Sequence, residues 1–119
     1  MKIRIKGNSL RFRLTKSDFV TLLSDMCIME QSDFLSGTFV YGIRVTQDEN
    51  LSADFRDGNM LLSLPVAMLL ELMKTDKVGF KNDNGPVALL IEKDFTCLDN
   101  VEEDQSDNFP NPLIERETK

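Results

Sequence analysis

The side chains best suited to bind a ligand are six Lys and Arg residues, five of them within the first 13 positions. They are Lys2, Arg4, Lys6, Arg11, Arg13 and Arg44. Arg offers a planar fork of donors that fits phosphate and carboxylate oxygens, and Lys adds a compact positive charge. These residues predict a surface that binds a small phosphate-like anion or an acidic peptide.

Three carboxylates form a second candidate set, for metal binding. Glu92 and Asp94 alternate along one expected strand, so they share a face, and Asp54 lies on another expected strand. Two carboxylates together with water can hold Mg²⁺. An ion pair between Glu92 and Lys77, across a predicted Asn84-Gly85 turn, explains the same pattern without a metal.

The composition excludes several kinds of catalysis. The chain has no histidine, so a Ser-His-Asp triad, a Cys-His pair and a His-ligated zinc site are ruled out. Cys27 and Cys97 form no C-x-x-C pair, and we expect both to be reduced, buried thiols. No hydroxyl or thiol has an adjacent base in the sequence, so we predict no catalytic residue and no cofactor.

The charge of the chain is unevenly distributed around a net value of −6. Residues 1–16 contain six basic residues and no acid, whereas residues 92–119 contain three basic and nine acidic residues. The overall acidity argues against duplex DNA binding, which needs a continuous basic surface. The start of the chain lacks the apolar core of a signal peptide, and the longest apolar stretch is shorter than the ~20 residues of a membrane span. We therefore expect a cytoplasmic protein without membrane contact.

The basic residues belong to a predicted hairpin. Residues 2–6 and 10–14 alternate apolar and basic side chains, as half-buried strands do, and Gly7-Asn8 suits a tight turn between them. The register pairs like charges on one face, namely Lys2 with Arg13 and Arg4 with Arg11. Because opposed like charges destabilise a sheet, we expect a bound anion, a carboxylate such as Asp54 or the acidic end of the chain over this face. Simple exposure to solvent is the remaining alternative.

A hairpin, a helix and a second hairpin follow one another twice along the chain. Thr15 begins the first helix, with Asp18 at the capping-box position, and Pro65 begins the second. The other strands are expected at residues 28–34, 38–46, 52–56, 60–63, 77–82 and 87–93.

A shift of 50 residues superposes the apolar positions of the two halves. We therefore interpret residues 1–98 as one domain made of two ββαββ repeats, 1–50 and 51–98, followed by an acidic C-terminal tail at 99–119. Eight antiparallel strands need closure or a second sheet to protect their edges. We predict an α+β fold with a strongly curved sheet or barrel, two helices outside and a polar interior. An open α+β sandwich is the alternative.

Two resemblances add to this interpretation. The opening K-I-R-I-K-G-N-S-L-R-F-R-L-T and the ending L-I-E-K-D-F-T-C-L-D, followed by D-N-F-P-N-P, resemble an uncharacterised family of small bacterial proteins with a domain of unknown function. The order of elements is similar to that of CYTH-like barrels, the triphosphate tunnel fold. That resemblance implies inward Lys and Arg for phosphates and carboxylates for a metal ion. In place of the E-x-E-x-K motif of that fold, this chain has Lys2, Arg4 and Lys6.

Three functions are consistent with these observations. The leading one is non-enzymatic binding of a small anion or an acidic peptide on the basic strand face. The alternative is a metal-dependent phosphohydrolase of tri- or polyphosphate or of nucleotides, with Mg²⁺ held by Glu92, Asp94 and Asp54. The third is a protein-interaction module, including a homodimer through the apolar helix Pro65–Lys74, in which Met68 would face the partner.

Overall fold

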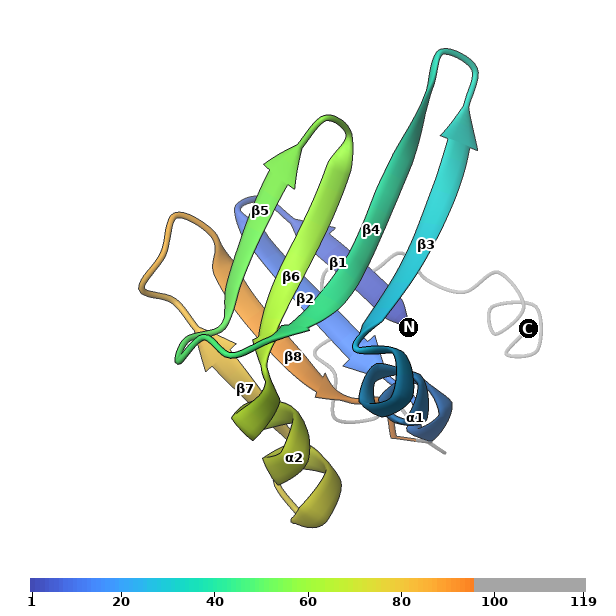
Figure 1. Cartoon of the computed structure of the whole chain (residues 1–119). Helices are drawn as coiled ribbons and strands as arrows, with labels where there is room; N and C mark the ends of the chain where they lie inside the picture. The colour runs from blue at the N-terminus through green and yellow to red at the C-terminus, as the bar shows by residue number, and fades with distance from the viewer. Residues whose placement is uncertain (96–119) are drawn as a thin grey trace, which may run out of the picture.

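The strands of the protein form two separate mixed sheets. The computed structural model describes residues 1–95. The first sheet has the order β1 (Lys2–Lys6), β2 (Ser9–Leu14), β8 (Ala88–Lys93), β7 (Gly79–Asn82). The second sheet has the order β3 (Cys27–Phe34), β4 (Gly37–Thr46), β6 (Asn59–Pro65), β5 (Ser52–Arg56) (Figure 1). Helix α1 (Lys16–Asp25) follows β2, and helix α2 (Val66–Lys74) follows β6.

The predicted antiparallel barrel is wrong. Each sheet takes one hairpin from each half of the chain, and the two hairpins join through a parallel pair, β2 with β8 and β4 with β6. Neither sheet is closed into a barrel, so β1, β7, β3 and β5 are edge strands. The error concerns long-range pairing, because turn residues specify each hairpin but not the hairpin beside it. The predicted repeat boundary at residue 98 and the predicted acidic tail lie outside the described residues.

The local predictions for the first hairpin and the first helix are confirmed. The β1–β2 hairpin has the expected register, and Gly7 adopts a φ of 53° in its turn, a conformation that favours glycine. The Thr15 hydroxyl accepts a hydrogen bond from the Asp18 N–H, and the Asp18 carboxylate accepts one from the Thr15 N–H. This capping box begins α1 where the sequence predicts.

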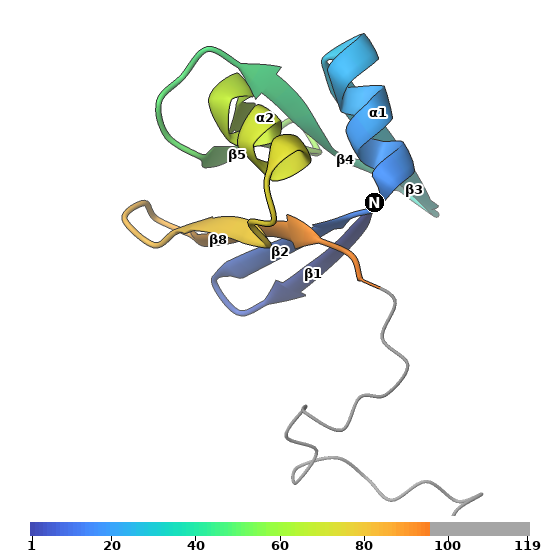
Figure 2. The ribbon, with the colours of Figure 1, turned by 90° about the horizontal axis from the view of Figure 1, so that it is seen from below.

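One apolar core is enclosed by the two sheets and the two helices. Its largest fully buried side chains come from both halves of the chain: Phe12, Leu14, Leu22, Ile43, Leu51, Leu62, Leu64, Leu69, Leu72 and Ile91. Both helices lie at the same end of the sheets (Figures 1 and 2). Met68, predicted to face a partner, is half-buried and packs against this core. Neither helix within residues 1–95 has the length and apolar content needed to cross a membrane.

The close approach of β3 and β4 gives a stability prediction. A Cβ at Gly42 would overlap the Ile28 carbonyl oxygen and the side chain of Met29, the residue directly opposite. We expect Gly42→Ala to lower the free energy of unfolding by about 1–3 kcal/mol, because a backbone atom must move to make room. Gly37→Ala on the same strand is the control, since no atom lies within 4 Å of its Cβ position. Urea unfolding compares the two variants, and equal stability would contradict this account of the packing.

Candidate anion-binding surface

The basic side chains of β1 and β2 lie on the face of the first sheet that points away from the core. Because β8 pairs with β2 in parallel and β7 pairs with β8, opposite positions on this face form three rows across the sheet. The rows are Lys2–Arg13–Glu92, Arg4–Arg11–Leu90–Lys81 and Lys6–Ser9–Ala88. Strand β8 thus brings a carboxylate from the second half of the chain onto the basic face.

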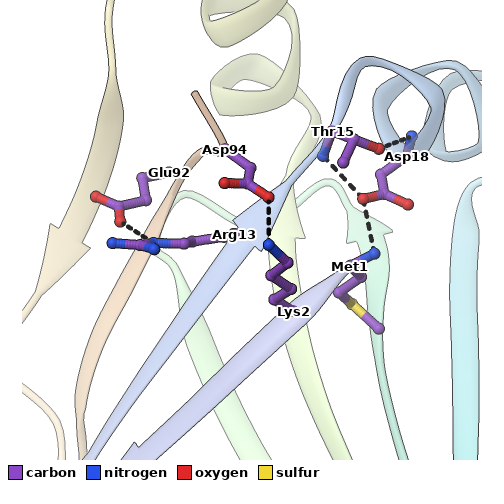
Figure 3. A network of polar contacts seen from close by, with 7 residues as sticks. All are labelled: Met1, Lys2, Arg13, Thr15, Asp18, Glu92 and Asp94. Carbon is purple, nitrogen blue, oxygen red and sulfur yellow. Dashed lines mark hydrogen bonds and ion pairs between the residues drawn. The ribbon is translucent and has the colours of Figure 1, made fainter. Parts of the chain in front are cut away.

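Glu92 neutralises two of the arginines. Its Oε1 accepts a hydrogen bond from Arg11 Nε at 2.6 Å and one from Arg13 Nε at 3.0 Å (Figure 3 shows the second). The Glu92 side chain is only 14% exposed, and the side chains of Arg11 and Arg13 are 31% and 36% exposed, respectively. The Glu92 carboxylate therefore neutralises one member of each predicted like-charge pair, Arg11 opposite Arg4 and Arg13 opposite Lys2.

The predicted ion pair between Glu92 and Lys77 is wrong. Gly79 lies opposite Glu92 in the β7–β8 register, because the connection between these strands spans residues 83–87 rather than a two-residue turn. The Lys77 ammonium lies instead 3.7 Å from the Glu71 carboxylate and 4.5 Å from the centre of the Phe80 ring.

The three predicted metal ligands are not brought together. Glu92 is engaged by arginines, and the carboxylate of Asp94, just past the end of β8, lies 3.3 Å from Lys2 Nζ (Figure 3). Asp54 lies on β5 in the other sheet, where its carboxylate lies 2.9 Å from Arg56 Nε, so it supplies no countercharge to the basic face. Within residues 1–95, no group of three Asp, Glu, Cys or His side chains is arranged to hold a metal ion.

Two residues of the predicted site have no acidic partner in the part of the chain that the structure describes. No carboxylate oxygen of residues 1–95 lies within 4 Å of the charged groups of Arg4 or Lys6. Both side chains line a depression of about 360 Å³ on the outer face of the first sheet. Arg11 lines it as well, although its guanidinium is shared with Glu92.

Lys81 on β7 is a further basic residue of this depression, and it is absent from the predicted site. It stands in the same row as Arg4 and Arg11 and has only a loose, exposed ion pair with Asp83 at 3.7 Å. Its place on this face depends on the parallel pairing of β2 with β8, which no local signal in the sequence specifies. We call the surface formed by Arg4, Lys6, Arg11 and Lys81 the basic depression.

Two other predicted residues lie on the second sheet. Arg44 is exposed on β4 and lines a separate depression of about 420 Å³ together with Asp54 and Arg56, so it is not part of the basic depression. Cys27, at the start of β3, is an exposed free thiol, and the prediction that it is buried is wrong. Cys97 lies outside the described residues.

A buried ion pair anchors β1 to the beginning of α1. The Met1 amino group lies 2.8 Å from a carboxylate oxygen of Asp18 (Figure 3), and Asp18 is only 8% exposed. Burial alone raises the pKa of the Asp18 carboxyl, but hydrogen bonds from the Met1 amino group and from Thr15 outweigh this effect. The net pKa lies below the ordinary value of 3.8.

These features define an α+β protein in which one of two mixed sheets presents a basic depression on its outer face. The chain belongs to a family of unknown function, DUF7009, whose sequence profile matches residues 1–113. This match confirms the resemblance to a family with a domain of unknown function and supports no specific activity. No curated protein and no solved structure matches the chain significantly. The resemblance to CYTH-like barrels is not supported, because neither sheet closes.

The shared carboxylate of Glu92 gives a second stability prediction. We expect Glu92→Gln to lower the free energy of unfolding by about 1–3 kcal/mol, because two partly shielded guanidinium groups lose their countercharge. Raising NaCl should restore part of this loss, since salt screens the like charges that remain. Urea unfolding at low and high NaCl measures both effects.

The control for Glu92→Gln is Asp54→Asn, which breaks an exposed ion pair on the other sheet. It should change the free energy of unfolding by less than about 0.5 kcal/mol. A Glu92→Gln variant as stable as its parent at low salt would contradict the role assigned to this carboxylate.

The lowered pKa of Asp18 predicts a pH dependence. The Asp18 carboxylate stabilises the fold above the unfolded-state pKa of about 4, and this contribution is lost as the pH falls through the lower folded-state pKa. Asp18→Asn should therefore cost about 1–2 kcal/mol at neutral pH, and its difference from the parent should shrink below about pH 4. Unfolding curves between pH 7 and pH 2 measure this difference.

Asp25→Asn, at the other end of α1, is the matched control for Asp18→Asn. A carboxylate near the C-terminus of a helix interacts unfavourably with the helix dipole, so this variant should not lower the free energy of unfolding at neutral pH. A difference between parent and Asp18→Asn that stays constant down to pH 2 would show that the carboxylate charge is not what stabilises the cap.

Proposed function

We propose that the protein binds small oxyanions in the basic depression formed by Arg4, Lys6, Arg11 and Lys81. The observation that carries the proposal is that Arg4 and Lys6 lack a carboxylate within 4 Å among residues 1–95, although bases beside them are paired. Like charges in neighbouring positions of a sheet repel one another. An anion held between them removes this repulsion and adds charge-assisted hydrogen bonds.

The balance of charge on this face supports the proposal. Six bases stand on or beside the outer face of the first sheet, and the described carboxylates near them are only Glu92, Asp94 and Asp83. The face thus has an excess of positive charge on a chain whose net charge is −6. Because salt screens charges beyond roughly 8–10 Å under physiological conditions, an approaching anion interacts mainly with this local excess.

The size and lining of the depression favour a small ligand. Its volume is about 360 Å³, and small side chains, Ser9 and Ala88, leave space between the bases. The Ser9 hydroxyl donates to the Lys6 carbonyl oxygen at 2.7 Å. The chemistry that fits is a phosphate or carboxylate group with several free oxygens, carried either by a free anion or by the side chains of an acidic peptide.

The carboxylates nearest the site support binding rather than metal-dependent hydrolysis. Glu92 is held by Arg11 and Arg13, and Asp94 pairs with Lys2. A carboxylate bonded to a base must give up that partner before it can hold Mg²⁺, and the bases would then be left without a countercharge.

The proposal predicts an anion-specific rise of Tm. Pyrophosphate and triphosphate should raise Tm more than NaCl at equal ionic strength, because only a ligand bound to the native state stabilises it by mass action. At about 100 times Kd the added stability is roughly 2.7 kcal/mol, which corresponds to a rise of several degrees for a domain of this size. Differential scanning fluorimetry measures the shift, and calorimetric titration gives the stoichiometry.

Two variants test whether the basic depression causes this rise. The double variant Arg4→Gln/Lys6→Gln should lose the anion-specific shift and keep its Tm in chloride, since neither side chain has an ion pair to lose in the described structure. Arg44→Gln, on the other sheet, is the matched control and should respond as the parent does. A pyrophosphate shift that survives in the double variant, or that Arg44→Gln removes, overturns the proposal.

A tetraglutamate peptide at matched ionic strength distinguishes the two sources of the anionic group. A larger shift with the peptide than with pyrophosphate identifies the carboxylates of an acidic peptide as the ligand. The reverse result identifies a phosphate-like anion.

A further inference from the structure

Strand β3 is the longest of the four edge strands and has neither a basic residue nor a proline. Natural sheets protect their edges with short strands, charged side chains, prolines or bulges. Strand β1 has three basic side chains, β5 has one acidic and one basic, and β7 has only four residues. By contrast, β3 has eight residues, of which two are acidic and none is Lys, Arg, Pro or Gly, and every position except Ile28 is exposed.

The apolar face of the second sheet continues from the core onto an exposed aromatic surface with residues from β3, β4 and β5. Phe34 and Phe55 are 68% and 63% exposed, and Leu35 at the hairpin tip is fully exposed. The Phe39 ring packs edge-on against Tyr41 at 5.7 Å and Phe55 at 6.3 Å between ring centres. The β3–β4 hairpin projects beyond the other strands (Figure 1). Exposed apolar surface of this kind marks an interaction site.

The backbone of β3 has donors and acceptors that point away from its own sheet. The Val45 N–H donates to the Met26 carbonyl oxygen at 2.9 Å, which fixes the alternation of the antiparallel β3–β4 ladder. Every second residue from Met26 onward therefore bonds to β4. The residues between them, Met29, Gln31 and Asp33, direct their N–H and C=O groups to the outer edge of β3, where no strand of residues 1–95 pairs with it.

We propose that two copies of this chain form a dimer by antiparallel pairing of β3 with β3, about a two-fold axis at Gln31. In this register Phe34 lies opposite Ile28 of the partner subunit, both on the apolar face. Glu30 lies opposite Ser32, and Met29 lies opposite Asp33. The outward N–H and C=O groups of the two Gln31 residues bond to each other across the axis.

Charge favours this register over its neighbours. An axis at Glu30 or at Asp33 places two identical carboxylates opposite each other, which destabilises a sheet. An axis at Ser32 places the Glu30 carboxylate opposite the Phe34 ring. An axis at Gln31 opposes no like charges and pairs the apolar side chains at both ends of the strand. The edge of β3 is therefore complementary to itself.

Proline at position 31 tests the pairing. Because the Gln31 N–H points away from β4, Gln31→Pro removes the bond across the axis while leaving the β3–β4 ladder intact. Gln31→Thr keeps the N–H and is the matched control. We expect the full chain to dimerise in sedimentation equilibrium, Gln31→Thr to dimerise similarly, and Gln31→Pro to dimerise at least about tenfold more weakly, since two hydrogen bonds are lost. Circular dichroism and urea unfolding verify that Gln31→Pro is folded.

Substitutions at Ser32 test the register and do not depend on proline. Ser32→Lys places a positive charge opposite Glu30 of the partner subunit and should strengthen the dimer. Ser32→Glu places a second carboxylate there and should weaken it. A parent chain that is monomeric at all concentrations, a folded Gln31→Pro variant that dimerises as tightly as its parent, or Ser32 variants with equal dimer affinity would each overturn the proposal.

Discussion

The parallel pairing of β2 with β8 is the interaction on which the rest of the structure depends. On its inner face β8 contributes Leu89 and Ile91 to the core, and on its outer face it places Glu92 between two arginines. The pairing extends by one residue before β2 and one residue after β8. The Ala88 N–H donates a hydrogen bond to the Asn8 carbonyl oxygen at 3.0 Å, and the Asp94 N–H donates one to the Leu14 carbonyl oxygen at 2.8 Å. Without β8 and Asp94 just past its end, the first hairpin would carry opposed basic side chains and no described countercharge.

The second sheet repeats this backbone arrangement but not its charges. Strand β4 lies beside β6 as β8 lies beside β2. In the first sheet Arg13 lies opposite Glu92, whereas at the equivalent place in the second sheet Ser63 lies opposite Arg44. A shift of 50 residues makes Asp54 equivalent to Arg4, so an acid replaces a base there. The two sheets thus share a strand arrangement, whereas within residues 1–95 only the first presents a cluster of bases on its outer face. The surface chemistry of one sheet cannot be carried over to the other from the shared backbone.

The sequence predicts the local structure well because its signals are local. The Gly7-Asn8 turn sets the register of the first hairpin, and the capping box of Thr15 and Asp18 begins α1. What the sequence did not predict depends on partners that lie far apart along the chain. The position of Lys81 in the same row as Arg4 and Arg11, and the contact of Glu92 with Arg11, require β8 to lie parallel to β2. Alternation within one strand carries no information about which strand lies next to it.

The edges of the two sheets show how charge determines what each sheet can contact. On β1 the same bases that form part of the basic depression also repel another strand with the same sequence, so this edge is unsuited to self-pairing. On β3, Glu30 is the single carboxylate of the apolar face, and Ser32 lies two residues further along the strand. The proposed pairing about Gln31 places Glu30 of one copy opposite Ser32 of the other. The basic depression lies on the outer face of the first sheet, whereas β3 is an edge of the second. The proposed pairing through β3 would therefore leave the basic depression of each copy open.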